Sequence, residues 1–177
     1  MNHASVISNV HTKMDVKMDM GKIRRDYLDL SQGPEIRALI THCNFDGDSN
    51  GFIGLCVMAD LLPNLTSVSA PDCWVLSDFL QMLVNKAPKL EQLRLTYMDD
   101  ACMDVINKCK CPLKLLDIEP SKKLQDASVT TFVTNFPSTV FLVRIAEDDG
   151  ADERINQLQA AAYKGNPEIG VEMYSII

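Results

Sequence analysis

The stretch DGDSNGFIGLCV, residues 46–57, has the residue types and spacing of a calcium-binding loop. Asp46, Asp48 and Asn50 occupy positions 1, 3 and 5 of the EF-hand pattern, and a glycine follows at the turn position. Position 12, where the pattern needs a bidentate Glu, is Val57, and the sequence holds no second copy of the motif. The matches at positions 1, 3 and 5 support one hypothesis, a calcium-responsive module. The alternative is a polar turn that uses the same residues for its backbone conformation.

Cysteines are the other residue type that could ligate a metal or act as a nucleophile. The chain has Cys43, Cys56, Cys73, Cys102, Cys109 and Cys111. The pair in CKC has one intervening residue where structural zinc sites have two to four, and no second pair completes a site. None of the three histidines is placed to serve as the base for a thiol nucleophile. We expect reduced, buried structural thiols, with no catalytic residues, no metal and no cofactor.

Composition narrows the class of protein further. The 177 residues carry a net charge of −7, which disfavours non-specific binding to nucleic acid. No apolar run is long enough to span a membrane. The opening MNHASVISNVHTK lacks the apolar core of a signal peptide, so we expect a cytoplasmic or nuclear protein.

The prolines indicate an internal repeat. Pro34, Pro63, Pro88, Pro112 and Pro137 recur at nearly even intervals, with a period in the twenties that is typical of repeat proteins built from short units. The first interval is the longest. We assign its excess length to the Gly/Asp/Asn turn described above.

A spacing of LxxLxL follows each proline, and its last two apolar positions would share the inner face of a short strand. The five trios are Ile36/Leu39/Thr41, Leu65/Val68/Ala70, Leu90/Leu93/Leu95, Leu113/Leu116/Ile118 and Val140/Val143/Ile145.

Helices are predicted between the strands. LSDFLQMLVNKAP, MDDACMDVINKCK and LQDASVTTFVTNFP each have an aspartate at the third place, Asp78, Asp100 and Asp126, where it can cap the first turn. Behind it, apolar residues at i, i+3 and i+4 form one stripe that would face the strands. These stripes are Leu80/Leu83/Val84, Cys102/Val105/Ile106 and Val129/Phe132/Val133. Residues 152–177 could add a last helix and a final strand.

The stretch LPNLTSVSAPDCWVLSDFLQMLVNKAPKLEQLRL resembles the cysteine-containing leucine-rich repeats of the ribonuclease-inhibitor-like superfamily, most of all those of F-box/leucine-rich-repeat proteins. The resemblance implies an α/β leucine-rich-repeat solenoid of about five to six strand–loop–helix units, with a parallel sheet on its concave face. We expect a disordered tail over residues 1–20 and the repeat domain over 21–177. No F-box is recognisable in the chain.

The resemblance also implies a non-catalytic protein-interaction module, used for substrate recognition in a ubiquitin-ligase context. The expected partners are a protein on the concave face and a cullin-ligase adaptor. Exposed side chains near the C-terminal end of that face would form an apolar cluster with charges at its rim. The candidate partner-binding residues are Arg94, Leu115, Asp117, Phe141, Leu142 and Arg144. We expect Trp74, the only tryptophan, to pack against a neighbouring loop, and contact with a partner is the alternative.

Overall fold

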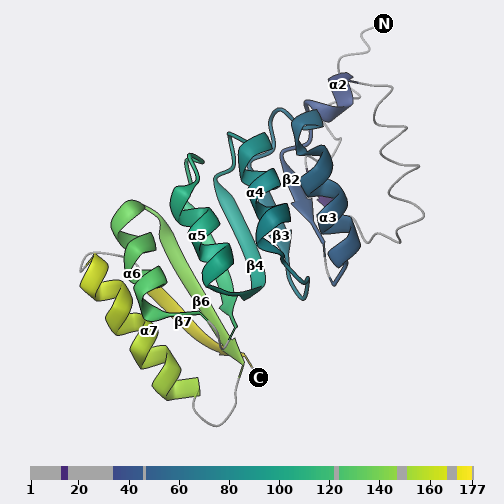
Figure 1. The fold of residues 1–177 in the computed structure, drawn as a ribbon. Coiled ribbons are helices and arrows are strands. Elements are labelled where there is room, and N and C mark those ends of the chain that lie inside the picture. The colour runs from purple at the N-terminus through teal and green to yellow at the C-terminus, as the bar shows by residue number, and fades with distance from the viewer. Residues whose placement is uncertain are drawn as a thin grey trace, which may run out of the picture.

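The computed structural model describes residues 13–15, 34–45, 47–121, 124–146, 151–166 and 171–176. Within them, strands and helices alternate in an α/β fold (Figure 1). The strands are β1 Lys13–Asp15, β2 His42–Asn44, β3 Ser67–Ala70, β4 Gln92–Met98, β5 Leu115–Pro120, β6 Val140–Ala146 and β7 Val171–Ile176. The helices are α2 Pro34–Arg37, α3 Ser49–Met58, the 3-10 turn η3 Ala59–Leu61, α4 Ser77–Lys86, α5 Asp100–Lys108, α6 Asp126–Asn135 and α7 Ala151–Gly165.

All strands join one parallel sheet in which the spatial order follows the chain order, β1 to β7. The pairing repeats the same register from unit to unit. Its buried column runs through residues that are almost evenly spaced along the chain, Cys43, Val68, Leu93, Leu116 and Phe141. The expected parallel sheet with alternating strand–helix units is confirmed.

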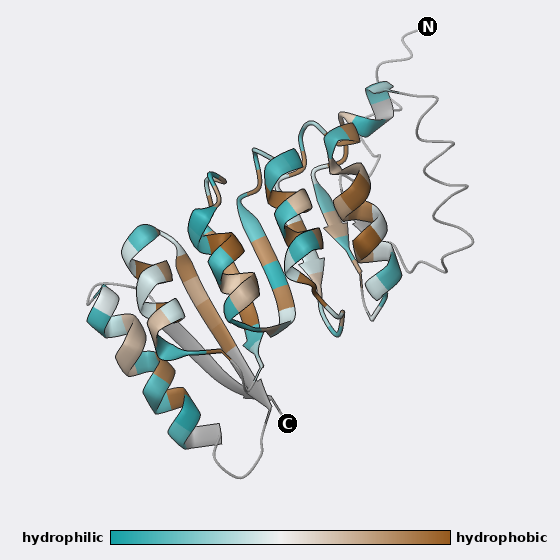
Figure 2. Ribbon diagram, in the orientation of Figure 1, coloured by the Kyte–Doolittle hydropathy of each residue, from teal (hydrophilic) through white to brown (hydrophobic). Residues whose placement is uncertain are grey.

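Helices α3 to α7 lie side by side along one face of the sheet (Figure 1). The predicted apolar stripes of α4, α5 and α6 are all buried against the strands. Figure 2 shows this division, with hydrophobic segments along the strands and on part of each helix and hydrophilic segments on the rest. Each fully buried Leu or Phe stabilises the fold by roughly 1.5–3 kcal/mol relative to an exposed one.

The predicted cap residues are wrong by one or two positions. Asp99, rather than Asp100, caps α5 by accepting a hydrogen bond from Cys102 N at 2.9 Å. Asp78 and Asp126 likewise lie inside the first turns of their helices, where a negative charge favours the helix dipole. Asp100 reaches the next unit, where it accepts from Gln125 N at 2.8 Å.

The first unit has a different register from the predicted one. Its inner residues are Ile40, Cys43 and Phe45, all buried, whereas Leu39 of the predicted trio is 43% exposed. The interval from Cys43 to Val68 equals the interval from Val68 to Leu93, so the expected insertion in the first unit does not exist. The Pro34 alignment was misleading because Pro34 opens helix α2, whereas the equivalent proline of the next unit stands in the turn before a strand.

The sequence predicted the secondary structure at the C-terminal end of the described chain, but it did not predict the strand at the N-terminal end. The expected last helix and final strand are α7 and β7. Residues 13–15, inside the tail expected to be disordered, form β1, which pairs with β2. An open strand edge offers unpaired backbone groups, and a short strand satisfies them. The remaining tail residues lie outside the described ranges.

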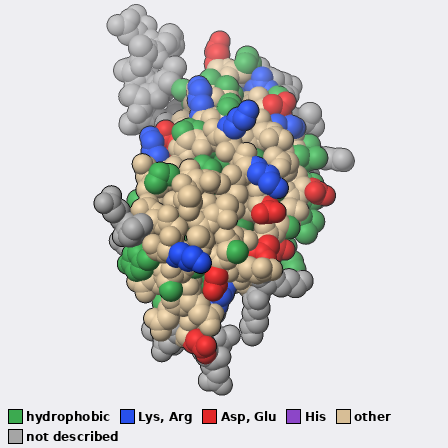
Figure 3. Space-filling model, turned by 60° about the vertical axis from the view of Figure 1, so that its left-hand side comes forward, with side chains coloured by type: hydrophobic (Ala, Val, Ile, Leu, Met, Phe, Trp, Pro, Cys, Tyr) green, Lys and Arg blue, Asp and Glu red, His purple; other side chains and the backbone are tan. Residues whose placement is uncertain are grey.

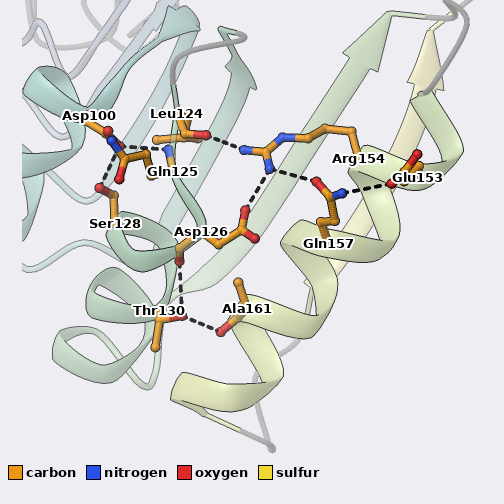
Figure 4. Close-up of polar contacts among 10 residues, drawn as sticks. All are labelled: Asp100, Leu124, Gln125, Asp126, Ser128, Thr130, Glu153, Arg154, Gln157 and Ala161. Atoms are coloured by element: carbon orange, nitrogen blue, oxygen red, sulfur yellow. Dashed lines mark hydrogen bonds and ion pairs between the residues drawn. The ribbon is translucent and has the colours of Figure 1, made fainter.

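Helix α7 is held to α6 by polar contacts and a close approach (Figure 4). Arg154 Nη1 donates to Asp126 Oδ1 at 2.7 Å, and its Nη2 donates to the carbonyl of Leu124. Thr130 Oγ1 donates to Ala161 O at 3.0 Å. Across the described residues, none of the helices has both the length and the apolar character needed to cross a bilayer.

Gly165→Ala is expected to destabilise the protein by about 1–3 kcal/mol, because overpacking forces the neighbouring backbone to move. A Cβ at this position would lie 2.4 Å from Val133 Cγ2 and 2.5 Å from Thr130 O. Urea denaturation measures the change. Ala160→Gly, on the exposed face of α7, is the control and reports helix propensity alone, about 1 kcal/mol. A Gly165→Ala protein at least as stable as the parent would contradict the close approach of α6 and α7.

Candidate functional site

The face of the sheet opposite the helices, here called the strand face, presents two columns of side chains. Along β4, Leu93 and Leu95 are buried while Gln92 and Arg94 are exposed, because neighbouring residues of a strand point to opposite faces. The register extends this alternation across the sheet. One column is His42, Ser67, Gln92, Leu115 and Val140, and the other is Asn44, Ser69, Arg94, Asp117 and Leu142.

Arg94 and Asp117 form an ion pair in the second column. Their strands are adjacent, and Arg94 Nε lies 3.4 Å from Asp117 Oδ2. The Arg94 side chain is 45% exposed, whereas that of Asp117 is only 12% exposed. Arg94 therefore keeps a solvent-facing edge while Asp117 holds its position.

The apolar part of the candidate site consists of Leu115, Val140 and Leu142. Leu115 and Val140 are register partners on β5 and β6, and Leu142 follows Val140 by two positions on the same face. Val140 is 45% exposed, and the two leucines are half-buried. Of the predicted apolar residues, Leu115 and Leu142 lie on this face, and Val140, which the sequence analysis had assigned to an apolar position of the LxxLxL spacing, lies beside them.

Phe141 was expected on this surface, and that expectation is wrong. Its side chain is fully buried, with its ring centroid 5.2 Å from that of Phe132 on α6. Phe141 pairs with Leu116, so β6 faces inward at 141 and outward at 140. The LxxLxL count started at Val140 and therefore took 143 and 145 as the inner pair, which left Phe141 ahead of the strand among the outward positions. The strand begins at Val140, so Phe141 already points inward with Val143. Arg144 lies opposite Tyr174 on the neighbouring strand, and its side chain is outside the described residues.

The stretch that resembles a calcium loop is the start of helix α3. Asp48 caps the helix, with its Oδ1 accepting from Gly51 N at 2.9 Å. From Ser49 onward the chain is helical, and Phe52, at position 7 of the pattern, is buried in the core. A helix turns its side chains in different directions, so the described positions of the pattern, residues 48–57, do not surround one point. Asp46 lies outside the described residues.

Cysteine side chains connect neighbouring units. Cys73 Sγ donates to Phe45 O at 3.2 Å, and Cys102 Sγ donates to Val75 O at 3.7 Å. Each bond reaches back into the preceding unit and satisfies a buried carbonyl. The six cysteines are all free thiols.

The thiols differ in acidity because their surroundings differ. Burial raises the pKa of Cys43 and of Cys56 to about 12, since the thiolate loses its hydration. At the end of α5, a hydrogen bond from the Cys111 thiol lowers the pKa of Cys109 to about 7. The same hydrogen bond, followed by burial, raises the pKa of Cys111.

A second exposed feature, which the sequence analysis saw only in part, lies at the loops. Trp74 stacks on Tyr97 of the following unit, a residue of strand β4 and not of the neighbouring loop against which Trp74 was expected to pack. Its ring is nevertheless 70% exposed. Tyr97 was not singled out from the sequence, because nothing local marks a strand tyrosine as a stacking partner.

Figure 3 shows the side of the molecule with α6 and α7 brought forward, and there positive and negative side chains are intermixed. Among the described residues seen there, lysines and arginines are scattered between acidic side chains. No protein-family model, curated protein or solved structure matches this chain.

Phe141→Ala is expected to lower the free energy of unfolding by about 3–5 kcal/mol, because it leaves a cavity beside Phe132. Val140→Ala, at the preceding position on the exposed face, is expected to change it by less than about 1 kcal/mol. Denaturant titration of both variants compares the two positions. Equal losses would contradict the register of β6.

Alkylation of Cys109 by iodoacetamide is expected to accelerate as the pH rises through about 7, because the thiolate forms above its pKa. Peptide mass mapping of the native protein, with Cys43 and Cys56 as unlabelled internal controls, measures it. Cys111→Ala removes the hydrogen bond and should move the midpoint toward the ordinary thiol value, about 8.5. An unchanged midpoint in that variant would contradict the assigned cause.

Proposed function

We propose that the chain is a leucine-rich-repeat solenoid that acts as a non-catalytic protein-interaction module and binds its partner on the strand face. The register that repeats at nearly even chain intervals, the strand order that follows the chain and the helices on a single face support this architecture. A sheet of this kind leaves one face to a partner.

The observation that carries the proposal is the composition of that face at β4 to β6. Leu115, Val140 and Leu142 put apolar surface next to the Arg94–Asp117 ion pair. An exposed apolar patch with polar residues at its rim is typical of a protein-binding surface, and arginine is enriched in such surfaces. Neighbouring strands are about 4.8 Å apart, so the two columns span roughly 20 Å from β2 to β6, which suits a protein surface.

The resemblance to the repeats of F-box/leucine-rich-repeat proteins favours one cellular context. There the strand face would recognise a substrate of a ubiquitin ligase, and a cullin-ligase adaptor would be a second partner. The cytoplasmic or nuclear location expected from the sequence is compatible with that context.

The experiment is quantitative capture from cell extract with the tagged full chain, followed by mass spectrometry. Arg94→Gln/Val140→Asp is expected to reduce recovery of the specific partner at least about tenfold, because it removes a charge and places a carboxylate in the apolar cluster. Met82→Asp, which changes a side chain that is 43% exposed on helix α4, is the matched control and should leave recovery unchanged.

Equal recovery by the strand-face variant and the parent would overturn the site. Circular dichroism of each variant shows whether a loss comes from unfolding. Enrichment of cullin-ligase adaptors tests the ligase context separately, because a strand-face partner without them supports a scaffold or inhibitor instead.

A further inference from the structure

The aromatic pair Trp74 and Tyr97, here called the aromatic platform, lies apart from the strand face. Trp74 is in the loop between β3 and α4, and Tyr97 is near the end of β4. Their ring centroids are 5.5 Å apart with an interplanar angle of 25°. Trp74 is 70% exposed, Tyr97 43% and nearby Leu76 55%, so apolar surface gathers at this edge. Exposed aromatic side chains that are held in place are typical anchors of recognition sites.

The backbone under the platform is held in place at a cost in free energy. Tyr97 has φ +56°, a left-handed conformation that favours glycine, and the pairing of β4 with β5 is irregular between Leu95 and Met98. On the other side, Trp74 N donates to Ser49 Oγ at 2.8 Å. Thr96 Oγ1 donates to Cys73 O at 3.1 Å. Gly47 and Asp72, at the equivalent positions of the two preceding units, are left-handed as well (φ +68° and +56°), so this turn belongs to the repeat. At Tyr97 it presents a ring from backbone that the fold itself fixes.

Acidic residues flank the platform on both sides. Asp72 precedes Trp74 by two positions and Asp99 follows Tyr97 by two, so each aspartate Cα lies within about 7 Å of the ring-bearing Cα. Asp48 and Asp100 occupy the starts of the neighbouring helices. The described residues of the loop of the preceding unit and of the two loops that carry the platform, 45, 47–48, 71–76 and 99, include no lysine or arginine, and Lys122 and Lys123 of the following loop lie outside the described residues. The described surroundings of the two rings therefore favour a cation.

We propose that the aromatic platform binds an arginine side chain from an extended, basic segment of a protein partner. A guanidinium group is flat, keeps its charge and stacks on the face of an indole or phenol ring. Its aliphatic stem can lie along Leu76, and the charge is complemented by Asp72 and Asp99. The inference concerns a different surface from the strand face and does not depend on it.

Intrinsic fluorescence tests the proposal directly, because Trp74 is the only tryptophan of the chain. The probe is a capped pentapeptide with arginine at its second and fourth positions and glycine elsewhere. It is expected to change the emission of the full chain saturably, in a way that weakens with added salt. The matched peptide with glutamine in place of arginine should leave the emission unchanged.

Variants separate binding from folding. Tyr97→Gly removes the ring while suiting the positive φ, so it should weaken peptide binding about three- to fivefold without loss of the fold. Tyr97→Phe should bind within about twofold of the parent, since it keeps the ring. Asp72→Asn/Asp99→Asn should weaken binding about three- to tenfold, with the asparagine still capping α5. Asp104→Asn on the exposed part of α5 is the charge control.

Three results would overturn the proposal. One is an emission that stays unchanged up to about 10 mM arginine peptide, beyond the range of a specific weak site. Another is undiminished binding by Tyr97→Gly. The third is an emission that depends on protein concentration rather than on peptide, which would assign the platform to a contact between two copies of this chain.

Discussion

The structure depends on one constraint, the in-register parallel pairing of neighbouring strands. Pairing places the inner residue of each strand beside its equivalent in the next, so Val68, Leu93 and Leu116 form a continuous buried column. The helices pack on that column, and each must begin after its strand at a similar distance. A shift by a single position in any unit would turn its apolar side chains to the strand face and its polar ones to the core.

Polar contacts between units secure this stacking at both ends of the strands. Near the starts of the helices, Asp100 accepts from Gln125 N and from Ser128 Oγ of the next unit (Figure 4). At the other end, before the strands β5 and β6, Thr139 Oγ1 donates to Leu113 O at 2.6 Å. Buried thiols bond to carbonyls of the preceding unit in the same manner. Because every unit satisfies groups of its neighbour, the units are interdependent and the chain is stable as a stack.

The same arrangement leaves two surfaces of different character. The strand face joins Leu115, Val140 and Leu142 to an ion pair whose acidic member is nearly buried. The loops that follow the strands place an exposed aromatic pair beside acidic residues, and the tyrosine of this pair has a left-handed backbone conformation. Both surfaces are exposed because the helices cover only one face of the sheet. The opposite face and the connecting loops therefore remain open to solvent.

The sequence by itself determined the alternation of strands and helices, and it did so because hydrophobic periodicity is a local property. The stripes of α4, α5 and α6 and the inner residues of β3, β4 and β5 were all placed correctly. Tertiary structure decided the register at both ends. Phe45 and Phe141 are inner residues because β2 and β6 must match their neighbours, a non-local condition that the nearest proline does not report. The stacking of Trp74 on Tyr97 was likewise decided by tertiary structure, since only the pairing of β3 with β4 brings these distant parts of the chain together.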